Sequence, residues 1–353
     1  MYHDIATTLY KRGEASMDGY QMPQWAWAIF ALNTVVFLPV FLMISYTFQH
    51  VYPTLAIVED PSPPAYDPVS LNEDDQSVAD DRLPTADAAA ASGALVTSSL
   101  RSTHRAVYAV AGWRSLFRGY AAYLFMSIAT GLITVLLVML HVPAAIARIV
   151  SPLALVQPYA AWTHIVISTP SSKYFWQRLP PFKRTFKATA LPVLLASVAS
   201  ALTTTLPMVM ASLLRMNGWN MDQPNTLPQY NKDDAWKGVI VLFASLAIQI
   251  IFVIPTQVAL IRVQASFLPE EYDTIVPFDR SFGGKVEPAV VDGKGYVNML
   301  EALKRFSRAS WIRLIKLYVK IFWIVTGLTV IFLAIVIPEY ILIANHSRKV
   351  DEL

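Results

Sequence analysis

The sequence predicts an all-α membrane protein with six transmembrane helices. The chain of 353 residues is 55% hydrophobic and only 15% charged, and its mean hydropathy is positive. Its apolar residues form long continuous blocks instead of the alternating or amphipathic patterns of a soluble core. A hydrocarbon layer of about 30 Å needs roughly 20 apolar helical residues, and the blocks reach or approach this length. Because the blocks do not alternate, helices are expected and a β-barrel is not.

The blocks divide the chain into membrane segments and polar connections. We place the blocks at about 25–48, 120–140, 149–168, 188–214, 236–263 and 321–344. A break containing His141, Pro143 and Arg148 separates the second block from the third. The chain has no cysteine, which excludes disulfides, thiolate metal sites and cysteine nucleophiles.

The connection at 59–105 is the most hydrophilic part of the chain. Residues 59–87 contain nine acids, from Glu59 to Asp87, but only one base, Arg82. Prolines are present at 61, 63, 64 and 68. Such a segment cannot bury enough apolar area to offset its chain entropy, so we expect it to be disordered. It serves as a solvated tether in the simpler interpretation, and as a docking segment at 59–87 for a basic protein partner in the alternative.

Positive charge gathers on the connections after the first, third and fifth blocks, at 101–118, 169–187 and 304–320. The positive-inside rule places these connections in one compartment and both termini in the other. The strip at 173–187 has five cations and no acid. It could bind anionic lipid headgroups, at about 1 kcal/mol per cation, but topological anchoring explains it without a ligand.

A proline motif ends the fifth block. Its residues are Pro255-Thr-Gln257-Val-Ala-Leu260-Ile-Arg262-Val-Gln264. This run resembles the signature Pro-x-Asp/Glu-x-x-Lys/Arg-x-Arg-x-Gln, which closes each odd-numbered helix of the mitochondrial carrier family. The proline, the arginine and the last glutamine match. Gln257 replaces the acid and Leu260 the first base.

Other segments extend the resemblance. The run from Gly112 through Phe117-Arg118-Gly119 is similar to the family segment that enters each even-numbered helix. Phe186-Lys187-Ala188 occupies this place before the fourth block, and Ile312-Arg313-Leu314 does so more weakly before the sixth. Pro39 and Pro158 are the corresponding prolines of the first two repeats.

The resemblance implies three tandem helical hairpins in a pseudo-threefold arrangement, with repeats at about 25–140, 145–214 and 236–344. They form a membrane domain at 25–345, between a polar N-terminal segment, 1–24, and a polar tail, 346–353.

The implied function is transport of a small metabolite across an organellar membrane. Family gates are ionic, but the six motif positions lack those charges. They hold Phe41, Ile44, Ala160, Thr163, Gln257 and Leu260. The alternative is therefore a transport-inactive scaffold or adaptor.

The candidate substrate or gate residues are Gln257, Arg262, Gln264, Arg118, Lys187 and His164. Arg262 could snorkel as an interfacial anchor, which we favour, or it could bind an anion or close a helix by hydrogen bonding. His164 has no companion at metal-ligand spacing, so we expect hydrogen-bonded packing. Gln157, Gln249 and 203–205 suit interhelical hydrogen bonds. We find no enzymatic constellation, cofactor motif or nucleic-acid motif.

Two locations compete. The resemblance favours a mitochondrial membrane, inner before outer. The C-terminal Lys349-Val350-Asp351-Glu352-Leu353 is close to a luminal retention signal, and Asn345-His-Ser347 is a glycosylation sequon. The alternative is therefore the endoplasmic reticulum membrane.

Overall fold

A computed structural model describes most of the chain. The described residues are 20–21, 23–60, 95–214, 216, 235–284, 286, 294–346 and 348–349. The polar N-terminal segment up to residue 19, the acidic run 61–94 and the last four residues lie outside this part. The predictions for these segments are therefore not addressed by the structure.

Six helical stretches of the described chain are long and apolar enough to cross a membrane. They run Gln24–Val58, Leu100–Met139, Ala144–Ile167, Phe182–Leu213, Ala235–Ser266 and Arg308–Ile343. The second and sixth begin well before the predicted blocks, because helix continues through the basic segments that precede the apolar residues. Apart from one pair of two-residue strands, the regular structure of the described residues is helical, so the protein is a helical, multi-pass membrane protein, as the sequence predicts.

The three odd-numbered stretches are each interrupted by a short segment of different helical geometry. The first comprises α2 (Gln24–Leu42), the π-helical η1 (Met43–Val51) and α3 (Tyr52–Val58). The third comprises α7 (Ala144–Val150), the 3₁₀-helical η4 (Ser151–Leu155) and α8 (Val156–Ile167). The fifth comprises α10 (Ala235–Ile248), the π-helical η7 (Gln249–Val253) and α11 (Ile254–Ser266).

A proline follows each interruption within the first three residues of the next helix. These prolines are Pro53, Pro158 and Pro255. Proline cannot donate a backbone hydrogen bond, and its ring clashes with the preceding turn, so a local change of helical geometry accommodates it. Pro39, by contrast, lies inside α2. The sequence prediction was therefore wrong about which proline of the first stretch corresponds to Pro158 and Pro255.

The even-numbered stretches lack a proline directly after an interruption. The second joins α5 (Leu100–Ala111), the 3₁₀-helical η3 (Gly112–Phe117) and α6 (Tyr120–Met139). The fourth and sixth are the long helices α9 (Phe182–Leu213) and α13 (Arg308–His346). Short elements lie in the connections: η2 (Val96–Ser98), η5 (Phe175–Arg178) and α12 (Met299–Lys304).

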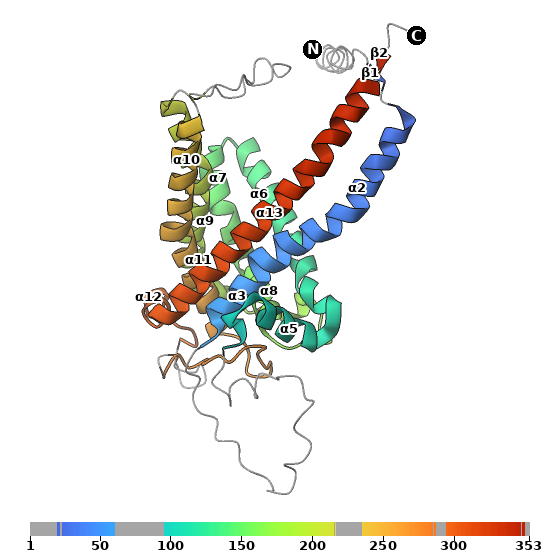
Figure 1. The fold of residues 1–353 in the computed structure, drawn as a ribbon. Coiled ribbons are helices and arrows are strands. Elements are labelled where there is room, and N and C mark those ends of the chain that lie inside the picture. Colours follow the sequence, from blue (N-terminus) through green and yellow to red (C-terminus); the bar gives the residue numbers. More distant parts are fainter. Residues whose placement is uncertain are drawn as a thin grey trace, which may run out of the picture. The chain divides into compact units, whose positions relative to one another are not determined.

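One compact unit contains the two ends of the chain, residues 1–49 and 319–353. In its described part, α2 packs against the C-terminal half of α13 through the rings of Phe37, Phe41 and Phe332. The amide of Asn33 donates to Glu339 Oε2 at 2.6 Å. Strands β1 (Tyr20–Gln21) and β2 (Arg348–Lys349) pair antiparallel, so both ends of the described chain lie side by side (Figure 1).

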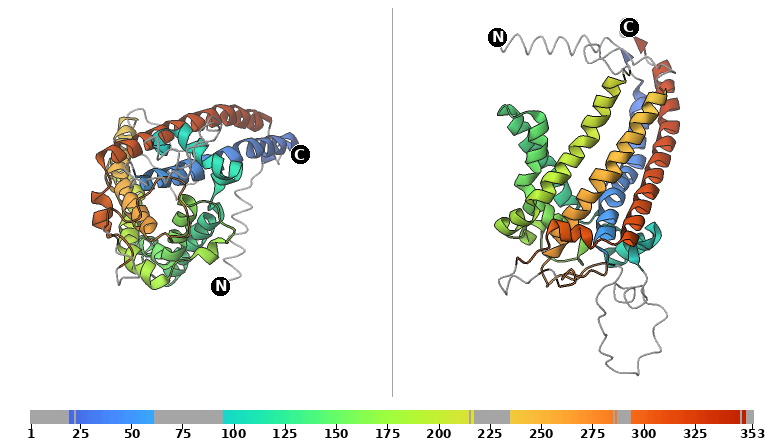
Figure 2. Two further views of the ribbon diagram at one scale, coloured as in Figure 1. Left: turned by 90° about the horizontal axis from the view of Figure 1, so that it is seen from below. Right: turned by 90° about the vertical axis from the view of Figure 1, so that its left-hand side faces the viewer.

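The second compact unit comprises residues 50–318. Helix α9 contacts α7, α8, α10 and α11, while the C-terminal segments α3, α8 and α11 of the odd-numbered stretches contact one another. Figure 2 shows α9 and α10 running side by side.

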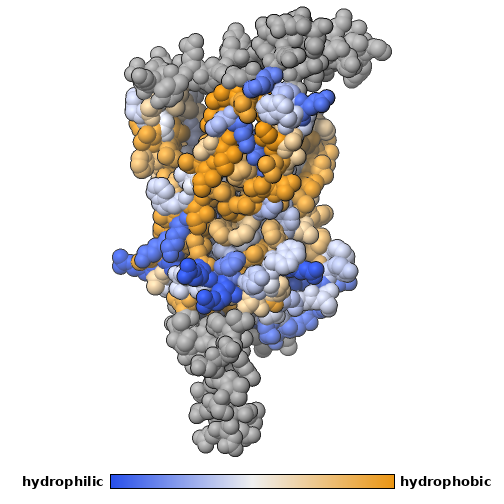
Figure 3. Space-filling model, turned by 45° about the vertical axis from the view of Figure 1, so that its right-hand side comes forward, coloured by the Kyte–Doolittle hydropathy of each residue, from blue (hydrophilic) through white to orange (hydrophobic). Residues whose placement is uncertain are grey.

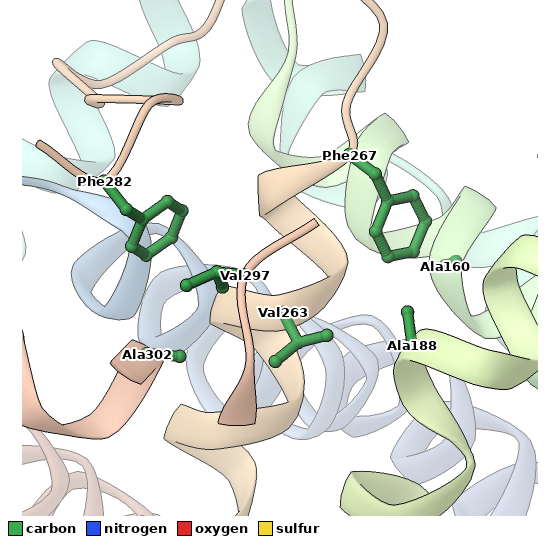
Figure 4. Close-up of a cluster of buried hydrophobic side chains, with 7 residues drawn as sticks. All are labelled: Ala160, Ala188, Val263, Phe267, Phe282, Val297 and Ala302. Atoms are coloured by element: carbon green, nitrogen blue, oxygen red, sulfur yellow. The ribbon is translucent and has the colours of Figure 1, made fainter. Parts of the chain in front are cut away.

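Buried side chains at one end of this unit form a small apolar cluster (Figure 4). Its members are Ala160, Ala188, Val263, Phe267, Phe282, Val297 and Ala302. They come from α8, α9, α11, α12 and the connection between α11 and α12, so this connection is packed onto the helices.

The outer surfaces of the helices are apolar. Large side chains such as Leu132, Met208 and Phe243 are exposed, and Figure 3 shows hydrophobic residues over most of the helical surface in view. Exposed apolar side chains of this kind suit contact with lipid chains rather than water.

Candidate functional site

A cavity of about 380 Å³ lies among the helices of the second unit. It is lined by side chains from α6, η4, α7, α8, α9 and α11. Its polar lining residues are Thr130, Arg148, Tyr159, Ser197, Ser200, Thr204 and Gln257, and its apolar ones include Pro152, Val193 and Leu260. None of the described lining residues is acidic.

Helix α9 presents one face to this cavity. Ser197, Ser200, Ala201 and Thr204 recur at spacings of three and four residues, which places them on one side of an α-helix. Of the three threonines at 203–205, only Thr204 lines the cavity. In the sequence these threonines stand out only as polar residues in an apolar block. The helical periodicity turns only Thr204 toward the cavity.

Arg148 is the only charged lining residue among those described. It lies in α7, four residues after the helix begins, and is exposed. It makes no hydrogen bond or ion pair with any described residue. The sequence identified Arg148 only as part of a break between two blocks.

Buried side chains form hydrogen bonds at the C-terminal end of α3. We call these side chains, Glu59, Arg262 and Arg313, the Glu59 lock. Arg313 Nη1 lies 2.8 Å from Glu59 Oε2. Arg313 Nη2 donates to the carbonyls of Ala56 and Glu59, each at 3.2 Å. Helix ends leave carbonyls without partners, and arginine side chains supply the missing donors here.

Arg262 completes the lock from α11. Its Nε donates to the carbonyl of Ala302 at 3.1 Å and its Nη1 to that of Ile57 at 3.2 Å. The guanidinium also lies over the rings of Phe282 and Phe306, with centroids 4.9 and 5.4 Å away. Only 4% of Arg262 is exposed. The favoured interpretation as an interfacial anchor was therefore wrong, and helix-closing hydrogen bonds are observed instead.

Glu59 is fully buried, and its carboxylate also holds the chain that precedes α5. Its oxygens accept from Val96 N at 2.5 Å, from Thr97 N at 3.1 Å and from Thr97 Oγ1 at 2.5 Å. Residues 95–105 form η2 and the beginning of α5, and Ser99 with Ser102 makes a capping box. The expectation of disorder was therefore wrong for Glu59 and for 95–105.

A second buried network joins α8 to α11. Thr163 Oγ1 donates to Gln264 Oε1 at 2.6 Å, and His164 Nε2 donates to the carbonyl of Gln264 at 2.8 Å. His164 is 2% exposed and contacts the ring of Phe267 edge-on. Hydrogen-bonded packing of His164 is thus confirmed.

Helix α11 connects the cavity to both networks. Gln257 and Leu260 line the cavity, and Arg262 and Gln264 follow on the same helix. At a rise of about 1.5 Å per residue, Gln257 and Gln264 are separated by roughly 10 Å along the helix axis. Leu260 is closer still, four residues or about one turn before Gln264, so the cavity lies within one to two turns of the hydrogen-bonded end of α11.

Two candidate residues lie elsewhere. Arg118 is half-buried where η3 ends, and Lys187 is exposed near the beginning of α9. Neither is among the residues that line the cavity. Gln257, Arg262 and Gln264, which the sequence resemblance singled out, lie on one helix, α11, but only Gln257 lines the cavity. The resemblance did not point to Tyr159 or Glu59.

The basic strip at 173–187 is partly engaged within the protein. Lys173 Nζ pairs with Glu271 at 3.1 Å, and this hydrogen bond holds the pKa of the Glu271 carboxyl below its usual value. Arg178 donates to Ser168 Oγ and lies over the ring of Tyr272. Arg184 donates to the carbonyl of Gly295. The remaining cations of the strip are Lys183 and Lys187, both exposed.

The fold and the cavity define a multi-pass helical membrane protein with a polar chamber among its helices. Comparisons with protein-family models, with curated proteins and with solved structures gave no match.

Proposed function

We propose that this protein is a carrier for a small solute, which occupies the cavity during passage across the membrane. The observation that supports this most directly is the position of the cavity on α11, beside an end that is closed by buried hydrogen bonds. A carrier needs a solute site that is closed on one side at a time, and this geometry suits one such state.

Several features support a carrier-like arrangement of three hairpins. An interruption and a proline recur in each odd-numbered stretch, and the three segments that follow them contact one another. In this proposal, the Glu59 lock and the bonds of Gln264 take the place of the ionic gate that the motif positions lack. Opening would separate Arg313 from Glu59, and solute binding would have to favour the open state enough to offset that loss.

The test is uptake into vesicles that contain the purified protein, with radiolabelled nucleotides, carboxylates and amino acids as a panel. Thr204→Leu enlarges a side chain in the cavity and is expected to reduce the uptake of any solute that is carried. Thr203→Leu is the matched control, because Thr203 precedes it on α9 but does not line the cavity. Uptake no higher than in protein-free vesicles for the whole panel would overturn the proposal.

A second function, that of a static scaffold or adaptor, is favoured by the way Glu59 is held. Its carboxylate accepts hydrogen bonds from Val96, Thr97 and Arg313, and such an extensively satisfied buried group is costly to open. Absence of uptake, together with a basic protein crosslinked specifically to residues 61–94, would establish this function. Uptake that Thr204→Leu reduces, with no such partner, would exclude it.

For location we propose a mitochondrial membrane, inner before outer, on the resemblance of the 255–264 run to the carrier signature. Fractionation of the untagged protein tests this. Co-sedimentation with endoplasmic reticulum markers, with Asn345 glycosylated, would overturn it.

A further inference from the structure

We infer that the cavity binds a small organic anion, a carboxylate or a phosphate ester, with Arg148 as its charge partner. This inference rests on the proposed function for the idea that the cavity holds a solute, and it adds the chemical class of that solute. It is tested below by binding rather than by uptake, so the two can fail separately.

The charge of the lining is one-sided. Arg148 is cationic, and no described lining residue is acidic. An arginine within a membrane-spanning stretch usually faces a partner, water or the interface. The described part of the chain supplies no acid to Arg148, so an anion in the cavity would complete its coordination. The guanidinium fork matches the two oxygens of a carboxylate or phosphate group.

Several uncharged donors are also available in the cavity. Thr204 Oγ1 already donates to the carbonyl of Ala201 at 3.0 Å. In contrast, the hydroxyls of Ser197 and Ser200 and the amide of Gln257 make no hydrogen bond to any described residue. These donors come from α9 and α11, whereas Arg148 comes from α7. A bound anion could therefore accept hydrogen bonds from three helices.

The size and the apolar lining restrict the ligand further. Ligand cavities span roughly 300–1,000 Å³, and a volume of about 380 Å³ lies at the small end. Pro152, Val193 and Leu260 offer apolar contact. A bare inorganic ion would leave these surfaces unused, so the site suits a charged group attached to a compact carbon skeleton.

The test compares three probes of one shape with the purified full-length chain in detergent: benzoate, neutral benzamide and cationic benzylamine. Benzoate is expected to raise the melting temperature in a concentration-dependent way, and the other two are not. Arg148→Gln should weaken benzoate binding by roughly tenfold to a hundredfold, the range for loss of a charge-assisted hydrogen bond. Arg148→Lys should retain part of the affinity. Arg101→Gln, on the exposed face of α5, is the control and should bind as the unaltered protein does.

Two results would overturn the inference. One is equal stabilisation by benzamide and benzoate, which would indicate an apolar site without charge selection. The other is unchanged benzoate affinity in Arg148→Gln. If Arg148→Gln does not fold, the three-probe comparison and Arg148→Lys still decide the question.

The anionic group could belong to a free metabolite or to a lipid headgroup. Measuring benzoate binding in nanodiscs of two lipids distinguishes these sources. If anionic phosphatidylglycerol weakens benzoate binding and neutral phosphatidylcholine does not, the site is assigned to a lipid headgroup. Equal benzoate binding in both lipids assigns it to a soluble anion. Benzoate binding without any vesicle uptake would support the anion site and count against carrier function.

Discussion

Arg313 and Glu59 are 254 residues apart in the sequence, and their side chains meet at 2.8 Å in the buried end of α3. Glu59 is fully buried and the side chain of Arg313 nearly so. Desolvation of two such charges is costly, and hydrogen bonds accepted by the Glu59 carboxylate and donated by Nη1 and Nη2 of Arg313 offset it, while Nε of Arg313 is buried without a partner among the described residues. The pair therefore stabilises one particular arrangement of α3, α13 and the turn at Val96–Ser98.

Breaking this pair should destabilise the protein strongly. Glu59→Gln or Arg313→Gln leaves a buried charge without its partner, and such changes cost about 3–5 kcal/mol. Thermal unfolding of the purified protein measures the effect. Glu271→Gln is the control: it removes an exposed pair with Lys173, and exposed pairs contribute about 0–1 kcal/mol. Equal melting temperatures for Glu59→Gln and Glu271→Gln would contradict the lock.

The bond between Thr163 and Gln264 should also contribute to stability. Thr163→Val leaves the buried oxygen of Gln264 without its donor, at a cost of about 1–3 kcal/mol. Thr205→Val is a matched control, because this exposed threonine donates only to the carbonyl of Ala201 in its own helix. A difference in melting temperature is expected between the two variants. Indistinguishable unfolding would mean that the bond joining α8 to α11 has little effect.

The paired termini can be tested by crosslinking, because the chain has no cysteine of its own. Tyr20 lies opposite Lys349 in an antiparallel pair. Opposed residues in such pairs have Cα atoms about 4.5–5.5 Å apart, which suits a disulfide. Tyr20→Cys combined with Lys349→Cys should form an intramolecular disulfide on mild oxidation, seen as a mobility shift that a reductant reverses. Each single variant is the control, and crosslinks only between molecules would contradict the pairing.

The six membrane stretches could be predicted because the apolar blocks are long, but the end of the first stretch could not. Gln49 and His50 appeared to end it, whereas the helix continues through Pro53 into α3. The polar side chains there are accommodated by tertiary partners. His50 Nε2 lies 3.0 Å from the hydroxyl of Tyr123, and Tyr52 donates to or accepts from His104 at 2.8 Å.

The candidate site was predicted only in part for a similar reason. The proline motif identifies Gln257 and Arg262 because they are close in sequence. Glu59 belongs by composition to an acidic, proline-rich segment, and nothing local distinguishes it from its neighbours. Its burial depends on Arg313, which a reading of local sequence cannot supply.

Labelling of a cysteine at position 257 tests the cavity most directly. Gln257 lines the cavity, while the next residue, Val258, is fully buried. In nanodiscs, Gln257→Cys is expected to react readily with a small, polar, membrane-impermeant thiol reagent, whereas Val258→Cys should react far more slowly. No reaction at position 257, or equal rates at both positions, would contradict a water-accessible cavity beside the closed end.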